Sequence, residues 1–252
     1  MKKDMQQGFV TFADIMGWKG IWLRNQGNED KILEELLAIK EKIERFIEIQ
    51  CRIDILKNIE ISIKLISDTF LVYSSFREDI NADIEMEFEF HSIVIKELII
   101  YTLEKNLMIR GATSYGKYIT NEMSFIGPAI DEAASWHEQA ESVAIFLTPT
   151  AFLKALKIDT SYWLEKNIEL KKMKLSTKIL NWKEFYKSNF EEILFENSPI
   201  VPEIAKKYLN TLEYINEKQQ PALREDNKRW FHGIQNNNRK YFGRSIWKYF
   251  QR

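Results

Sequence analysis

The stretch from residue 8 to residue 20 reads GFVTFADIMGWKG, and it decides how the rest of the chain is interpreted. Its first part, Phe9 to Ala13, is a run of β-branched and aromatic residues that predicts a buried strand. Asp14 follows directly, and a buried carboxylate must be hydrogen-bonded, paired or metal-bound because burying it alone is costly. Gly17 then lets backbone N–H groups turn toward an anion. A carboxylate beside such a turn suits a metal-bound phosphate ester.

A second stretch, Ile59 to Ser75, reads IEISIKLISDTFLVYSS. Two strand-like runs flank a short connection, which places Asp68 at the tip of a predicted hairpin. Two aspartates on neighbouring strand ends can hold two divalent cations, a common arrangement in phosphoryl chemistry. The alternative is that Asp14 caps a helix and Asp68 is an ordinary turn residue. The two stretches alone leave both interpretations open.

Two later stretches add further motifs. Residues 109–117 read IRGATSYGK, and residues 125–140 read FIGPAIDEAASWHEQA. Together, over roughly residues 8–182, the four stretches resemble the class III nucleotide cyclase catalytic domain. The matching segments are Phe12–Trp18, similar to the family's F-x-D-I-x-G-F/W; Ser67–Asp68, similar to its Gly-Asp hairpin; Arg110–Gly116, similar to its strand with an arginine and two glycines; and Gly127–Ala134, similar to its G-x-x-V-N-x-A-A helix start.

The periodicity and the resemblance agree on the fold class. We expect an α+β, ferredoxin-like βαββαβ core with a largely antiparallel sheet and helices on one face. Residues 1–182 would form the catalytic domain and residues 183–252 a C-terminal helical extension. The pattern predicts strands at 8–13, 59–66, 69–75, 108–117 and 143–147 with a hairpin at 163–182, and helices at 28–51, 90–105, 128–140 and from 149.

The resemblance implies a reaction in which the 3′-hydroxyl of a nucleoside triphosphate attacks its own α-phosphorus and releases pyrophosphate. It implies two Mg²⁺ or Mn²⁺ ions, and oxygen ligands suit these hard ions. It also implies a symmetric homodimer with active sites at the interface. Lys171, Lys172 or Lys174 could reach the triphosphate from the second subunit, although surface charge is the simpler interpretation of these lysines. The remaining roles fall on Asp14, Asp68 and the Ile15 carbonyl as metal ligands and on Gly17 and Trp18 as N–H donors to the β- and γ-phosphates. Arg110 falls at the family's phosphate-facing arginine, and its alternative role is an ion pair at the strand edge.

The chain also departs from the family. Purine cyclases of this family have an asparagine where Asp131 stands and an arginine where Ser135 stands, and their base-reading lysine and aspartate fall at Lys64 and Ser124. The variant helix looks like the pyrimidine cyclases of the bacterial Pycsar anti-phage systems, which make cyclic UMP or cyclic CMP. We therefore expect UTP, or else CTP, to be the substrate. A purine cyclase, or a catalytically inactive domain that binds a nucleotide, remains the alternative.

Composition narrows the class of protein. The chain has 252 residues and a formal charge of −1, which argues against a general nucleic-acid binder. A single cysteine, Cys51, excludes an intrachain disulfide, and with no signal-like or membrane-spanning run we expect a cytoplasmic protein. All formal charges from Lys228 to Arg252 are positive, so this tail either packs as a basic helix or attracts an anionic partner.

Overall fold

The computed structural model describes residues 5–18, 27–54, 56–77, 83–121, 124–158, 160–186, 190, 192–193 and 202–216. The chain divides into two compact units, Met1–Ile215 and Asn216–Arg252. Apart from Asn216, the described residues belong to the first unit. The predicted basic tail at 228–252 lies outside the described residues, and the boundary at residue 182 stays a prediction.

The sheet is built around its first strand. Strand β1 (Gln6–Ile15) pairs antiparallel with β3 (Thr69–Phe76) on one side and β4 (Ile109–Thr120) on the other, and β2 (Ile59–Ile66) pairs antiparallel with β3. Helix α2 (Glu29–Gln50) follows β1 and helix α3 (Ile84–Glu104) follows β3. The chain order βαββαβ and the neighbour order β2-β3-β1-β4 confirm the predicted α+β, ferredoxin-like core.

The second half of the unit extends this sheet. Strand β6 (Ile145–Leu147) runs parallel to β4, the one parallel pairing among the described strands, and the hairpin of β7 (Trp163–Glu169) and β8 (Lys174–Leu180) follows at the edge. Sequence analysis did not predict β5 (Phe125–Ile126), which pairs with the end of β4. The remaining elements are α4 (Pro128–Trp136), η1 (His137–Gln139), α5 (Pro149–Ala155), η2 (Trp182–Glu184) and α7 (Pro202–Asn216).

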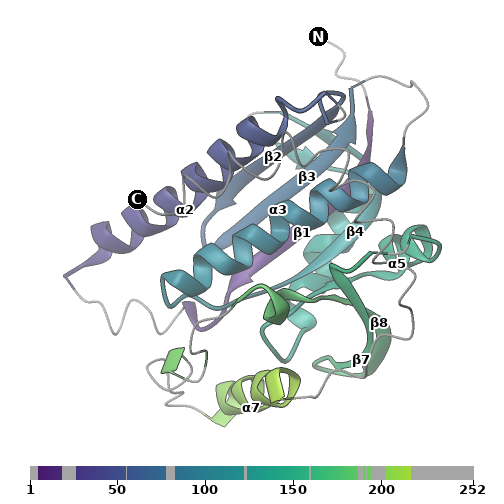
Figure 1. Cartoon of the computed structure of the whole chain (residues 1–252). Coiled ribbons are helices and arrows are strands. Elements are labelled where there is room, and N and C mark those ends of the chain that lie inside the picture. The colour runs from purple at the N-terminus through teal and green to yellow at the C-terminus, as the bar shows by residue number, and fades with distance from the viewer. Residues whose placement is uncertain are drawn as a thin grey trace. The chain divides into compact units, whose positions relative to one another are not determined.

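Helices cover both faces of the sheet, so the prediction of helices on one face is wrong. Helices α2 and α3 cross one face, as Figure 1 shows, and bury the main core against side chains such as Phe9 and Ala13. Helix α4 covers part of the other face with Ala129, Ile130 and Ala133. That face is apolar because alternate residues of the same strands, such as Val10 and Leu71, point to it.

Helix α3 begins six residues earlier than predicted. The side chain of Asp83 accepts a hydrogen bond from the Met86 N–H (3.1 Å) and caps the helix. Glu85 and Glu87 occupy the first turn, where negative charge is favourable at a helix N-terminus. Glu85, Glu87 and Glu89 therefore belong to the helix and do not precede it.

A buried chain of hydrogen bonds joins α3 to the sheet. The Ser74 hydroxyl donates to Glu87 (2.8 Å), so the Nδ1–H of His91 donates to Ser74 (3.0 Å), and Nε2 of His91 accepts from Thr11 (2.7 Å). The Phe9 N–H also donates to Glu87 (3.2 Å). Burial raises the pKa of Glu87 to about 7 and lowers the pKa of His91 to about 3, so this core favours both groups uncharged.

Glu87 makes the stability of the protein depend on pH. The folded chain keeps this proton up to about pH 7, whereas the unfolded chain releases it near the ordinary pKa of 4.5. The unfolded state thus binds fewer protons, and stability falls as pH rises through this window. We expect Glu87→Gln to remove this loss, so the free energy of unfolding of the variant relative to wild type rises by up to about 3 kcal/mol from pH 4.5 to 7.5.

Urea denaturation at both pH values measures this difference. The matched control is Glu85→Gln, which makes the same substitution at an exposed position in the same helical turn. A Glu87→Gln curve parallel to wild type would contradict the assignment of this titration to Glu87.

Candidate active site

Asp14 and Asp68 meet at one end of the sheet. Asp14 stands at the end of β1, opposite Thr69 of β3 and Arg110 of β4. Asp68 lies in the two-residue turn between β2 and β3, and its carbonyl accepts a hydrogen bond from the Ile15 N–H (3.0 Å). The structure therefore brings the two aspartates of the sequence motifs onto neighbouring strand ends.

Arg110 grips Asp14 in a buried ion pair. Its Nε lies 3.1 Å from Asp14 Oδ1 and its Nη2 lies 3.3 Å from Oδ2, while Nη1 donates to the carbonyls of Glu138 (2.8 Å) and Ala140 (3.3 Å). Both side chains are nearly inaccessible. The arginine that sequence analysis placed on a phosphate thus has its first partner within the chain, and its contact with a phosphate stays a prediction.

Burial raises the pKa of Asp14, and the charge and hydrogen bonds of Arg110 offset part of that rise. A charge on His137 would also lower the pKa of Asp14, while Glu138 raises it. Sequence analysis assigned no site role to His137, whose ring lies 5.8 Å from that of Phe12. The position of His137 depends on the packing of α4 and η1 against the face of the sheet that carries Asp14. No local sequence pattern indicates that packing.

Gly17, which follows Asp14, and Ser67, which precedes Asp68, both have left-handed backbone conformations. Gly17 has φ +76°, the conformation that the predicted anion-binding turn requires. Ser67 has φ +57°, a left-handed conformation that favours glycine. Trp18 is half-buried and packs against the main core.

The two residues expected to read the base are not in contact. Lys64 is half-buried on β2, and because Ile61 and Ile63 point into the main core, Lys64 lies on the face that α4 partly covers. Ser124 is exposed in the connection between β4 and β5, where its N–H donates to Asn121 Oδ1 (2.5 Å). No hydrogen bond joins these two side chains within the described residues, so a shared role in reading the base stays a prediction.

The helix residues that depart from the family are both exposed. Asp131 lies in the first turn of α4, and its carbonyl accepts the Ser135 hydroxyl (2.7 Å). Lys171 lies in the turn between β7 and β8 and pairs with Glu138 (3.2 Å), while Lys174 pairs with Glu169 (2.6 Å). Lys171 therefore contacts the same segment that holds Arg110.

The donor set at this end of the sheet fits Mg²⁺ or Mn²⁺. It comprises two carboxylates, Asp14 and Asp68, and the nearby carbonyl of Ile15, all oxygen ligands. Among the described residues, no group of three or more His, Cys, Asp and Glu side chains is placed to hold a metal. Few protein carboxylates are typical of Mg²⁺ sites, where water and substrate phosphates supply the other ligands.

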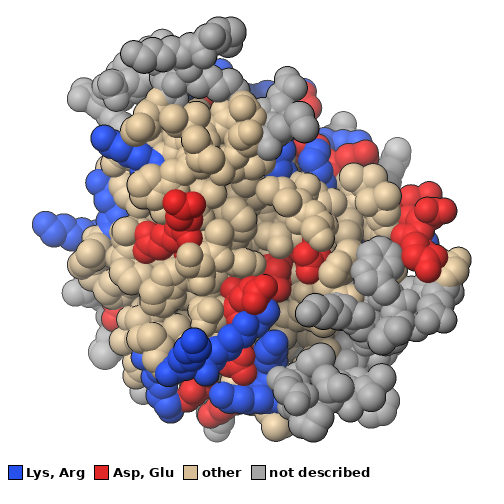
Figure 2. All heavy atoms as spheres, turned by 180° about the vertical axis from the view of Figure 1, so that it is seen from behind, with Lys and Arg blue, Asp and Glu red and all other residues tan. Residues whose placement is uncertain are grey.

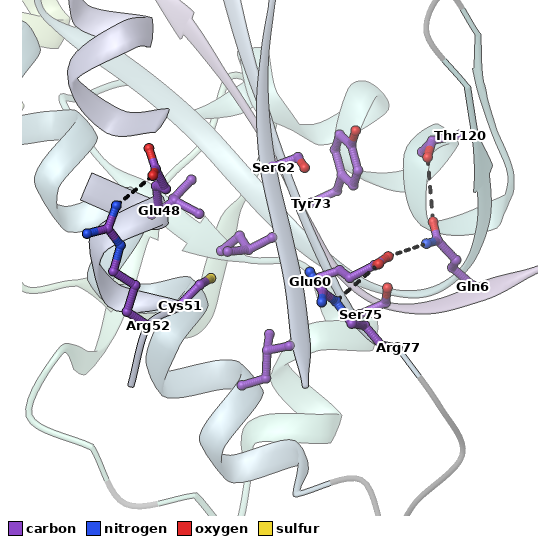
Figure 3. Close-up of a pocket in the computed structure, with 13 residues that line it drawn as sticks. Gln6, Glu48, Cys51, Arg52, Glu60, Ser62, Tyr73, Ser75, Arg77 and Thr120 are labelled. Atoms are coloured by element: carbon purple, nitrogen blue, oxygen red, sulfur yellow. Dashed lines mark hydrogen bonds and ion pairs between the residues drawn. The ribbon is translucent and has the colours of Figure 1, made fainter. Parts of the chain in front are cut away.

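A pocket of about 550 Å³ opens at the other end of the same strands (Figure 3). It wraps around the edge strand β2 and includes Gln6, at the start of β1, and Ser75, near the end of β3. A hydrogen bond between Gln6 and Glu60 (3.3 Å) and an ion pair between Glu60 and Arg77 (3.3 Å) cross it. This pocket contains no residue of the Asp14 site.

Among the described helices, none is long and apolar enough to cross a membrane.

Comparison with solved structures finds nucleotide cyclase domains. The monomeric guanylyl cyclase domain of the RhoGC fusion protein from the aquatic fungus Blastocladiella emersonii is 13% identical, with a TM-score of 0.48 over 72% of this chain and 98% of that one. The guanylate cyclase domain of RhGC from Catenaria anguillulae, in complex with GTP, is 13% identical, with a TM-score of 0.46 over 71% and 98%. The adenylyl cyclase CyaB from P. aeruginosa is 15% identical, with a TM-score of 0.47 over 71% and 94%. No protein-family model and no curated protein matches the chain.

The ion pair between Asp14 and Arg110 should show strong energetic coupling. A double-mutant cycle of Asp14→Asn and Arg110→Gln is expected to give a coupling free energy of about 2 kcal/mol, because removing one partner leaves a buried charge uncompensated. The control cycle uses Lys42 and Glu104, a half-exposed pair 3.0 Å apart, for which less than about 1 kcal/mol is expected. Chemical denaturation of the two sets at pH 7.5 makes the comparison. Equal coupling free energies in the two cycles would contradict the assignment of Asp14 and Arg110 as a buried ion pair.

Proposed function

We propose that this chain is a nucleotide cyclase, a lyase that converts a nucleoside triphosphate to its 3′,5′-cyclic monophosphate and pyrophosphate. The observation that carries the proposal is the meeting of Asp14 and Asp68 on neighbouring strand ends, tied together by the hydrogen bond from the Ile15 N–H to the Asp68 carbonyl. The motif resemblance predicts this pairing of residues. An inactive nucleotide-binding domain would not need to keep two adjacent carboxylates, whose mutual repulsion a metal relieves.

Each residue has a defined task in this proposal. The carboxylates of Asp14 and Asp68 and the Ile15 carbonyl would hold two divalent cations. When bound, such ions favour deprotonation of the attacking 3′-hydroxyl and offset charge on the reacting phosphate. The N–H groups of Gly17 and Trp18 donate to the β- and γ-phosphates at the left-handed turn. Arg110 orients the Asp14 carboxylate through Nε and Nη2, and the second N–H of Nη2 would donate to a phosphate oxygen.

The preferred substrate in this proposal is UTP, with CTP second. Lys64 can donate to a carbonyl of uracil, and the Ser124 hydroxyl can donate or accept, whereas an adenine amine would lack a carboxylate acceptor. A buried polar group left without its partner discriminates strongly against the wrong base. The Asp131 variant of α4 supports a pyrimidine cyclase of the Pycsar kind, whose cyclic UMP would serve as a second messenger in anti-phage defence. The purine cyclase alternative uses the same metal residues.

A symmetric homodimer would complete the site. Lys64 and Ser124 do not meet within one chain, and α4 leaves Phe12, Tyr73 and Phe125 only partly covered on their face of the sheet. A second copy packed on this face would bury these aromatic side chains and bring residues of two chains together. Two-fold association is the commonest oligomeric arrangement of soluble proteins.

We expect Asp14→Asn and Asp68→Asn each to lower kcat about 1000-fold or more, because several kcal/mol of transition-state stabilisation depend on the ions they hold. The measurement is pyrophosphate release from the four nucleoside triphosphates with Mn²⁺. The control is Asp54→Asn, since the Asp54 side chain is 95% exposed in a turn away from the site. Substantial turnover by either site variant would exclude the two-metal assignment.

Base choice is tested by competition among ATP, GTP, CTP and UTP at equal concentration, with the products identified by mass spectrometry. We expect cyclic UMP to dominate, and Lys64→Ala to reduce the preference for UTP over ATP by about tenfold, the effect of one hydrogen bond from a charged donor. Dominant cyclic AMP or cyclic GMP would instead place the chain among purine cyclases.

A further inference from the structure

Helix α7 packs beside the candidate active site. The side chain of Asn210 donates to the Glu141 carbonyl (2.8 Å), and the Thr211 hydroxyl accepts from the Val143 N–H (2.9 Å). Glu141 and Val143 lie directly after Glu138 and Ala140, whose carbonyls accept hydrogen bonds from the guanidinium of Arg110. The helix therefore packs against the segment that positions Arg110.

Lys207 lies on the inward face of α7. It precedes Asn210 and Thr211 by three and four residues and so shares their helical stripe. Its side chain is half-buried, and within the described residues no hydrogen bond or ion pair engages its ammonium group. It is close enough to Asp14 and Arg110 to interact with both electrostatically.

Lys207 joins two other cations there. Arg110 comes from β4, and Lys171, paired with Glu138, comes from the turn between β7 and β8. Lys207 also interacts electrostatically with Lys171 and with Glu141. Figure 2 shows basic and acidic side chains intermingled toward the lower end of the molecule, the end where Figure 1 places α7.

Arg110 and Lys171 each pair with a carboxylate in this cluster, and of these cations Lys207 is the one left without an ion pair among the described residues. Burial, followed by the charge of Arg110, lowers the pKa of Lys207, and the attraction of Glu141 and Asp14 does not offset this. Asp14 is already engaged by Arg110. A half-buried ammonium group without a hydrogen-bonding partner is costly, and a bound anion would remove that cost.

We propose that Lys207 is a further substrate-binding residue, which holds the triphosphate of the nucleotide together with Arg110. The inference rests on the proposed function, because it takes the substrate to be a nucleoside triphosphate. A polyphosphate carries several negative charges, and a lysine serves it as a flexible point charge, while Arg110, whose fork holds Asp14, contributes its positive charge nearby. This gives α7 a role in the site of its own chain.

The test uses the full chain and inorganic tripolyphosphate as the probe, titrated calorimetrically in the presence of Mn²⁺. We expect Lys207→Gln to weaken binding about tenfold and Lys207→Arg to retain most of it, because the charge is what binds. The control is Lys206→Gln, which removes the same charge from the exposed neighbouring position and should change binding less than about twofold. Thermal denaturation of each variant checks that α7 still packs.

The outcomes separate this inference from the cyclase proposal. Loss of tripolyphosphate binding in Lys207→Gln but not in Lys206→Gln supports the inference, even if the wild-type protein forms no cyclic nucleotide. Equal binding by the two variants, or no binding of tripolyphosphate by the wild-type protein, overturns it, even if the enzyme is active. With active enzyme, a raised KM for the nucleotide in Lys207→Gln at nearly unchanged kcat is the further expected result.

Discussion

The buried ion pair between Asp14 and Arg110 sets the arrangement of this end of the molecule. It joins two adjacent strands at the end of β1, where neither charge has enough water to be stable alone. The guanidinium also needs acceptors for its remaining donors, and the carbonyls of Glu138 and Ala140 supply them. These hydrogen bonds fix the position of the segment just after α4. Lys171 and helix α7 then pack on this fixed segment.

Strand β1 carries polar groups toward both faces of the sheet, with different consequences. Thr11 points toward α3 and enters the buried chain of hydrogen bonds that runs through His91 and Ser74 to Glu87. That chain is closed to solvent and orders the strands against the helix. Asp14, three residues later, points the other way, toward α4 and η1. The alternation of a single strand thus places the buried hydrogen-bond network on one face of the sheet and the ion pair of Asp14 on the other.

Local patterns predicted the elements and their order well. Alternation and apolar runs located β1, β2 and β3, and the Ser67–Asp68 connection predicted their hairpin and the meeting of Asp14 with Asp68. The face that α4 covers was not predictable, because both faces of the central strands are apolar and periodicity does not say which helix covers which face. The pairing of Asp14 with Arg110 depends on register between residues far apart in sequence. The position of Lys207 depends on how α7 packs, which the sequence of that helix does not reveal.

The charges at the site have an order across the sheet that would orient a substrate. Asp68 lies on the β3 side of Asp14, and Arg110 lies on its β4 side with Lys171 and Lys207 beyond it. If divalent cations bind the carboxylates, they are drawn toward the β3 side, away from the positive charge of Arg110. The anionic end of a nucleotide is drawn toward the β4 side, where the cations gather. In the proposed function, a triphosphate would extend from the carboxylates toward α7. This separation of charges along the sheet would let one site hold both cations and an anion.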